Sequence, residues 1–170
     1  GAITVAALLG NAVFLQGGYA LAFPHFGAAR MGAPMNSFVR ISSQQIRVRS
    51  QVYEPDYIIV VDASLMRGFN VFQGMKEGGF AFINQQKQEK NIQVPEGVKV
   101  YDIPADELSM KIFGRPMGNT VLLGAFSAGS GEISLDSLEK AVEDKFSEKI
   151  ARLNKEAFRE GYQYFKENYA

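Results

Sequence analysis

The feature that most constrains the fold is the run Tyr57-Ile58-Ile59-Val60-Val61-Asp62, in which apolar and mostly β-branched residues follow one another without interruption. A strand with one solvated face alternates apolar and polar residues, whereas a continuous apolar run is typical of a strand buried on both faces. Such strands occur almost only in parallel sheets that helices cover. Two further predicted strands, Phe80–Asn84 and Val98–Asp102, flank the polar stretch Gln85–Glu96, which is predicted to be an exposed loop.

Helical patterns separate or follow these predicted strands. Residues 2–15 have apolar side chains at helical spacing, and Gly17-Gly18 ends that helix. Short helices are predicted near Leu65 and Val71, and longer ones over residues 104–113 and from the cap Asn119-Thr120 to about residue 128. The next predicted helix is capped by Ser134 and has Leu135, Leu138, Val142 and Phe146 on one face. The last has an apolar side formed by Ile150, Leu153, Ala157, Phe158 and Phe165.

The segments before this pattern are predicted to be strands of other kinds. Tyr19–Phe23 is short and apolar and suits a buried strand, while Ser37–Ile41 and Gln45–Ser50 are predicted to pair as an antiparallel hairpin. The predicted fold is a single α/β domain over residues 1–170, with three layers (α/β/α), a mainly parallel sheet and one β-hairpin. Because parallel α/β domains usually place a strand before the first helix, we expect a first strand that precedes Gly1 and is missing from this sequence.

The inventory of reactive side chains excludes several classes of site. The sequence has no cysteine, which excludes disulfides, thiol nucleophiles, Cys-ligated zinc and iron–sulfur clusters held by this chain, and its one histidine excludes a multi-histidine metal site. Basic and acidic residues number 18 each, and this zero net charge argues against nucleic acid or an anionic membrane as a general partner. Since no run of 18 apolar residues occurs, we expect a soluble, cytoplasmic protein.

The segment from Phe23 to Pro34 is the strongest candidate for a functional site. It is a loop rich in glycine and proline that leaves the carboxyl end of a predicted strand, where open α/β sheets place their ligands. Arg30 suits recognition of a carboxylate or phosphate, and Gly27 and Gly32 let the backbone approach a ligand or partner closely. The alternative is a structural loop in which Arg30 pairs with a neighbouring acid.

Other candidates each have a structural alternative. His25 suits general acid–base chemistry, or it is simply a packed histidine. Asp62 and Asp102 end predicted strands at one edge and suit a carboxylate pair, or each caps the segment that follows. Asn119 and Thr120 either present amides to an anion at a helix N-terminus or merely cap that helix. Finally, the arginine cluster of Arg40, Arg47 and Arg49 is either a docking face for an acidic partner or a solvated strand face.

At the glycine-rich loop the sequence resembles the gamma subunit of 2-oxoacid:ferredoxin oxidoreductases such as pyruvate synthase. The residues that carry the resemblance are Ala22-Phe23-Pro24-His25-Phe26-Gly27, Arg30 and Gly32-Ala33-Pro34, then Phe38-Val39-Arg40-Ile41, Ile46-Arg47, Val52-Tyr53-Glu54-Pro55-Asp56, Asp62 with Leu65, Asn119-Thr120, Leu123-Gly124-Ala125, Asn154, Ala157-Phe158 and Gly161-Tyr162. In that family a strand and a turn ending in Gly-Gln-Gly come first, and Gly1 is similar to the last glycine of that turn. The family loop has an acid and two basic residues where this sequence has Ala29, Arg30 and Met31.

The resemblance implies a non-redox subunit, with no catalytic residue of its own, of an enzyme that oxidatively decarboxylates a 2-oxoacid to an acyl-CoA with ferredoxin as the acceptor. Thiamine diphosphate and iron–sulfur clusters would then be held by alpha, beta and delta subunits, with ferredoxin as the partner of the assembly. Gly1, Gly27, Arg30, Gly32, Asn119 and Thr120 would contact coenzyme A or a neighbouring subunit. The alternatives are the small subunit of an indolepyruvate oxidoreductase and a stand-alone nucleotide-binding or scaffold domain.

Overall fold

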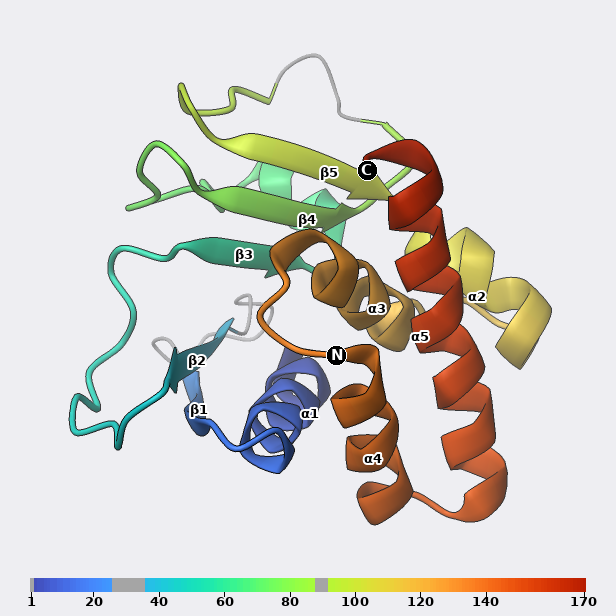
Figure 1. Cartoon of the computed structure of the whole chain (residues 1–170). Coiled ribbons are helices and arrows are strands. Elements are labelled where there is room, and N and C mark those ends of the chain that lie inside the picture. Colours follow the sequence, from blue (N-terminus) through green and yellow to red (C-terminus); the bar gives the residue numbers. More distant parts are fainter. Residues whose placement is uncertain (1, 26–35, 88–91) are drawn as a thin grey trace.

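The structure is a computed structural model that describes residues 2–25, 36–87 and 92–170. Its centre is a parallel sheet in the order β3-β4-β5, formed by β3 (Tyr57–Val60), β4 (Phe80–Asn84) and β5 (Lys99–Ile103) (Figure 1). Tyr57 is the partner of Phe80, and Phe80 in turn is the partner of Lys99. The α/β fold class predicted from the continuous apolar run is confirmed.

Side chains pack on both faces of this sheet, which explains the unbroken apolar sequences of β3 and of β4 up to Ile83. Phe82 and Ile103 belong to the larger core, together with α3 (Asn119–Ser130) and α5 (Glu148–Asn168). Alternate strand residues, including Val60, Ala81 and Ile83, form a smaller core with Met66, Phe72, Met75 and Val98. The second face is therefore covered by the short 3-10 helix η1 (Ala63–Arg67) and the turns around it, rather than by long helices.

Helices α3 and α5 cross so closely that glycine is required at both contact points. A Cβ built at Gly124 would lie 2.0 Å from the carbonyl O of Phe158, and one at Gly161 would lie 1.9 Å from the carbonyl O of Val121. Real side chains never approach a backbone oxygen so closely, because carbon and oxygen repel strongly well before that distance. The two glycines bring the two helices into direct backbone contact beneath the sheet.

The N-terminal part of the chain forms a second unit beside the parallel sheet (Figure 1). Helix α1 (Ala2–Leu15) packs on an antiparallel pair, β1 (Tyr19–His25) with β2 (Asn36–Ser42), and Gly10 faces the side chains of Ala20 and Ala22. The remaining helices are α2 (Ala105–Phe113), which follows β5, and α4 (Leu135–Lys145), which packs against α1 and α5.

The hairpin prediction is wrong in its pairing. Strand β2 pairs with β1, not with Gln45–Ser50, which belongs to no strand or helix. The strand Tyr19–Phe23 is real but antiparallel, and Tyr19 is 48% exposed instead of buried. Alternation in Gln45–Ser50 indicated a half-buried strand, but that pattern alone does not identify a partner.

Three helix predictions also need correction. The residues near Val71 form turns instead of a helix, and Ile150 is 47% exposed although it was placed on the apolar side of the last helix. The N-cap of α3 is Gly118, so Asn119 and Thr120 lie inside the first helical turn and do not cap it. Ser134 caps α4 as predicted, since its side chain accepts a hydrogen bond from the Ser137 amide.

The C-terminal residues close the outer edge of β5. The Tyr169 hydroxyl accepts a hydrogen bond from the Asp102 amide at 3.1 Å and donates one to the Asp102 carbonyl at 2.8 Å. The Tyr169 ring also packs edge-on against Tyr101 and lies beside Phe165. A side chain thus takes the place that a further strand would occupy at this position.

Candidate functional site

Polar side chains gather where the strands of the parallel sheet end. Asp62 follows β3, and its Oδ1 accepts hydrogen bonds from the Ser64 amide (3.0 Å) and hydroxyl (2.7 Å), so it caps η1. Asp102 lies near the end of β5 and accepts from Gln85 Nε2 at 2.8 Å. Because β4 lies between their strands, their backbones are about 10 Å apart. The two aspartates therefore do not form a carboxylate pair. Asp62 caps the segment that follows it, as the capping alternative predicts, whereas Asp102 lies within β5 and bonds to Gln85 instead.

Asn84, at the end of β4, organises this edge and was missed by the sequence analysis. Its Nδ2 donates to the Val61 carbonyl at 3.0 Å, and its Oδ1 accepts from the amides of Ala105 (3.0 Å) and Asp106 (3.3 Å). One side chain therefore joins the end of β3 to the first turn of α2. The reasoning that singled out Asp62 and Asp102 applies equally to a polar residue at the end of the strand between them.

The N-termini of α2 and α3 are fastened to each other at this edge. Asp106 Oδ1 accepts from the Gly118 amide at 3.2 Å, and a Cβ built at Gly118 would lie 2.7 Å from the Ala105 Cβ. Thr120 is buried and Asn119 is half-buried in the turn that follows. The positive end of α3 therefore already has a carboxylate against it, which weakens its attraction for a further anion.

The predicted loop lies largely outside the described residues, and so do four of the predicted site residues: Gly1, Gly27, Arg30 and Gly32. The two ends of the loop are described. The ladder between β1 and β2 continues to the last pair, His25 with Asn36, so the two residues that flank the segment 26–35 are strand neighbours. The backbone of His25 therefore belongs to the base that holds the loop.

The three clustered arginines have different surroundings. The Arg40 guanidinium donates from Nε (3.2 Å) and Nη2 (2.8 Å) to the Ser50 carbonyl, and from Nη2 to the Gln51 carbonyl at 3.0 Å. It therefore has a structural role, tying β2 to the chain that leads to β3. Arg47 and Arg49 are exposed, and no hydrogen bond or ion pair connects them to any other residue in the part of the chain that the structure describes.

A hydrogen-bonded junction at the surface connects α1, β3 and the start of α4. The Tyr57 hydroxyl donates to Glu132 Oε1 at 2.9 Å, while Gln16 donates to the Glu132 carbonyl and accepts from the Ser134 amide. Burial, then the hydrogen bond and negative charge of Glu132, raise the pKa of Tyr57 to about 12. The phenol therefore stays protonated at neutral pH and donates its hydrogen bond to Glu132.

An open cavity of about 570 Å³ lies on the second face of the sheet, between residues 66–72 and residues 92–95. Its lining includes Arg67, Phe69, Phe72 and Val94. None of the predicted site residues lines it. Its lining also includes Asn70 and Gln93, and no lining side chain carries a carboxylate, imidazole or hydroxyl group for acid–base or nucleophilic chemistry.

Within the described ranges, no three His, Asp or Glu side chains come together as a metal site. The same ranges contain no helix whose length and apolar character would let it cross a membrane. The site is thus a set of helix ends, a loop base and exposed arginines, suited to binding and docking.

Comparison with known proteins places this arrangement in a family. The family model described as pyruvate ferredoxin/flavodoxin oxidoreductase matches residues 1–164. The pyruvate/ketoisovalerate oxidoreductases common subunit gamma of Thermococcus litoralis is 37% identical over 166 residues, covering 96% of this chain and 90% of that protein. The pyruvate synthase subunit PorC of Methanothermobacter marburgensis is 42% identical over 166 residues, covering 98% of this chain and 92% of that protein.

Solved structures agree. The crystal structure of the pyruvate oxidoreductase subunit PORC of Thermotoga maritima superposes with a TM-score of 0.82 at 30% identity, covering 96% of this chain and 89% of that one. A 2-oxoglutarate:ferredoxin oxidoreductase of Magnetococcus marinus, with coenzyme A bound, shares the fold with a TM-score of 0.76 at 23% identity, over 97% of this chain and 29% of its own. The chain therefore belongs to the pyruvate ferredoxin/flavodoxin oxidoreductase family, among the gamma subunits of 2-oxoacid:ferredoxin oxidoreductases.

Proposed function

We propose that this chain is the gamma subunit of a multisubunit enzyme that oxidatively decarboxylates pyruvate or a related 2-oxoacid. The carboxylate leaves as carbon dioxide, the acyl group passes to the sulfur of coenzyme A with release of the thiol proton, and the two electrons pass one at a time to ferredoxin. The observation that supports this most strongly is a match, over nearly the whole chain, to gamma and PorC subunits. Those relatives are named for pyruvate and ketoisovalerate, which favours these substrates over indolepyruvate and favours an assembly over a stand-alone domain.

In this proposal the redox chemistry belongs to other subunits. The chain has no cysteine, the ligand that iron–sulfur clusters require, and within residues 2–25, 36–87 and 92–170 no acidic or histidine cluster replaces it. Iron–sulfur clusters and thiamine diphosphate would reside in alpha, beta and delta subunits, in a cytoplasmic assembly that ferredoxin visits. The gamma subunit would supply a shaped surface beside the reaction centre.

The loop between β1 and β2 is the part of that surface that we assign to coenzyme A. Its two ends are held one strand spacing apart by the pair His25 and Asn36. Arg30 supplies the charge for a phosphate, while Gly27 and Gly32 allow close backbone approach.

The other two candidate regions would have secondary roles. Gly1 precedes α1, whose N-terminus would add backbone amides to the same ligand. Asn119 and Thr120 begin α3, where the carboxylate of Asp106 disfavours a phosphate. Contact with a neighbouring subunit therefore suits the half-buried Asn119 better, whereas Thr120 is buried within this chain.

The test is reconstitution with co-expressed alpha, beta and delta subunits. The complete enzyme is expected to reduce ferredoxin in the presence of pyruvate and coenzyme A, while the gamma subunit alone is inactive. The variant Arg30→Ala is expected to raise the KM for coenzyme A about tenfold, equivalent to about 1.4 kcal/mol of binding, with assembly intact. Arg152→Ala, an exposed arginine on α5, is the matched control. Oxidation of a 2-oxoacid by the gamma subunit alone would refute the proposal.

A further inference from the structure

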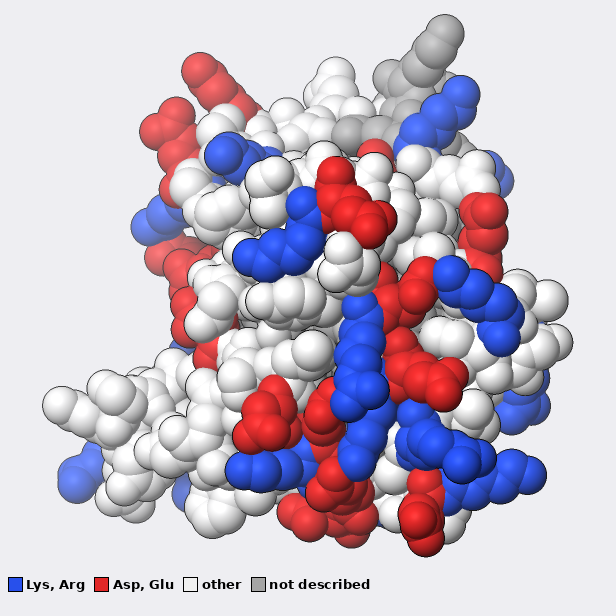
Figure 2. Space-filling model, turned by 45° about the vertical axis from the view of Figure 1, so that its right-hand side comes forward, with Lys and Arg blue, Asp and Glu red and all other residues white. Residues whose placement is uncertain are grey.

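Although the net charge of the chain is zero, its charged residues are unevenly distributed between residues 1–53 and residues 54–170. Residues 1–53 contain four arginines and no acidic residue, whereas residues 54–170 contain 14 basic and 18 acidic side chains. The lower-left lobe of Figure 2, where the N-terminal part lies, has blue and white atoms but no red ones, while the side formed by α2 and α5 mixes both signs. A field of one sign over one region steers a partner of opposite sign, even when the total charge is zero.

The most exposed part of this region is the segment of residues 43–53, which we call the basic arm. It joins β2 to β3, contains no helix or strand, and runs along the outer left of Figure 1. Arg47 and Arg49 alternate with Ile46 and Val48, and both arginines are exposed. Val48 is 56% exposed and Tyr53 is 67% exposed, so the arm also presents large apolar groups to solvent.

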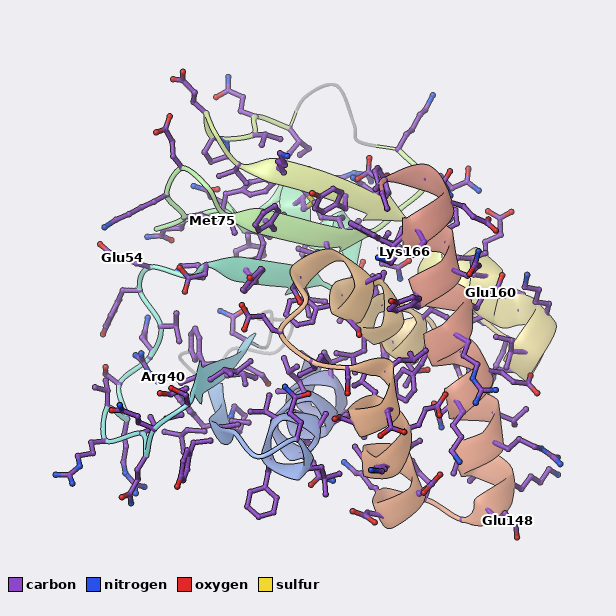
Figure 3. All side chains as sticks on the ribbon, viewed as in Figure 1. Arg40, Glu54, Met75, Glu148, Glu160 and Lys166 are labelled. Atoms are coloured by element: carbon purple, nitrogen blue, oxygen red, sulfur yellow. The ribbon has the colours of Figure 1, made fainter. Side chains whose placement is uncertain are left out.

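The arm is exposed, and its C-terminal end is firmly attached. Arg40, labelled in Figure 3, holds the carbonyls of Ser50 and Gln51 with three hydrogen bonds. Two residues after Gln51, a Cβ built at Gly74 would lie 1.9 Å from the Tyr53 carbonyl O, so the two backbones touch there. The C-terminal end of the arm, directly after Arg49, is therefore fixed before any partner binds, which lowers the entropy lost on association.

We infer that the basic arm is a docking surface for an acidic, partly apolar surface on another subunit of the same enzyme. Arginine is enriched at interfaces because it combines charge with apolar contact area, and aromatic residues such as Tyr53 are enriched there too. A second copy of this chain fits less well, since a two-fold contact would bring Arg47 and Arg49 against the same arginines. This inference rests on the proposed function, because it supplies the identity of the partner.

The experiment compares assembly of gamma variants with co-expressed alpha, beta and delta subunits. The arm variant is Arg47→Glu with Arg49→Glu. The control is Lys149→Glu with Arg152→Glu, which makes the same charge change on the exposed side of α5. A third variant, Arg47→Gln with Arg49→Gln, removes charge without adding repulsion, and thermal unfolding checks that every variant folds. Affinity is measured for the purified gamma chain binding to the assembled remaining subunits at low and high salt.

The arm variant is expected to bind at least about tenfold more weakly at low salt, whereas the control binds like the unmodified chain. The glutamine variant is expected to bind with an affinity between those of the arm variant and the control. In both arm variants the affinity should depend less on the salt concentration than in the unmodified chain. Equal binding by all variants, or equal loss in the control, would overturn the inference. Self-association of the gamma chain that the arm variant abolishes would overturn it too. Failure of the unmodified chain to join the other subunits would instead refute the proposed function.

Discussion

Replacing Gly161 by alanine tests the close crossing of α3 and α5. The new Cβ would lie 1.9 Å from the Val121 carbonyl O, whereas atoms of this kind settle at roughly 3.5 Å. The obstacle is backbone, which cannot rotate away as a side chain can. The helices must therefore separate by more than about 1 Å, which opens the packing around Phe158 and Val121.

Two opposing effects determine the magnitude. Alanine is better than glycine in a helix interior by about 1 kcal/mol, which favours the variant. Overpacking against an unyielding neighbour costs about 3 kcal/mol, at the upper end of its usual range. The free energy of unfolding is therefore expected to fall by about 2 kcal/mol, which lowers the Tm by about 4–8 °C in a domain of this size.

The matched control is the same substitution at Gly10, in the interior of α1. There the nearest atom to the new Cβ is the Ala22 Cβ at 3.4 Å, an ordinary contact distance. Gly10→Ala is expected to raise the free energy of unfolding by up to about 1 kcal/mol. Urea denaturation of both purified variants measures the two effects. If Gly161→Ala proves as stabilising as Gly10→Ala, the backbone contact between α3 and α5 does not exist as described.

Three further outcomes are expected. Asn84→Ala leaves the Val61 carbonyl and the first amides of α2 without partners, and should lower the free energy of unfolding in urea by about 1–3 kcal/mol; an unchanged value would contradict the role of Asn84 at the sheet edge. Because folding raises the pKa of Tyr57 from 10.0 to about 12, the protonated phenol stabilises the fold fully below pH 10, and this stabilisation is lost as the pH rises from 10 to 12. The Tm of Tyr57→Phe should therefore fall less steeply between pH 10 and 12 than the Tm of the unmodified chain. An identical slope for both would contradict a raised pKa of Tyr57 in the folded chain. Arg40→Ala releases the base of the basic arm, and trypsin should then cut after Arg47 and Arg49 several times faster; equal digestion rates would exclude Arg40 as its anchor.

The parallel sheet was the part of the fold that sequence alone predicted best. Its strand β3 packs against other residues on both faces, and such packing leaves a local signature, the apolar run that begins at Tyr57 and continues to Val61. The pairing of β2 has no such signature. Its partner β1 is separated from it by residues 26–35, and the nearer alternating segment around Arg47 gave an equally good local pattern.

In the candidate site, too, the roles that depend on neighbours in sequence could be predicted, and those that depend on distant segments could not. Capping by Asp62 was predictable because it needs only neighbours such as Ser64. The role of Asn84 was not predicted, since it depends on three segments meeting at one edge. Arg40 belonged to a cluster of three in the sequence, and only the structure separates it, as an anchor of backbone carbonyls, from the two exposed arginines.

The hydroxyl of Tyr169 has a practical consequence for handling the protein. It occupies the Asp102 backbone groups that face away from β4, at the margin of the sheet. A truncation that removes Tyr169, or a fusion that pulls it away, would uncover hydrogen-bonding groups ready to pair with another molecule's strand. Aggregation of such truncated chains during purification would then result from the exposed backbone groups of β5. An affinity tag is therefore better not placed at the C-terminus.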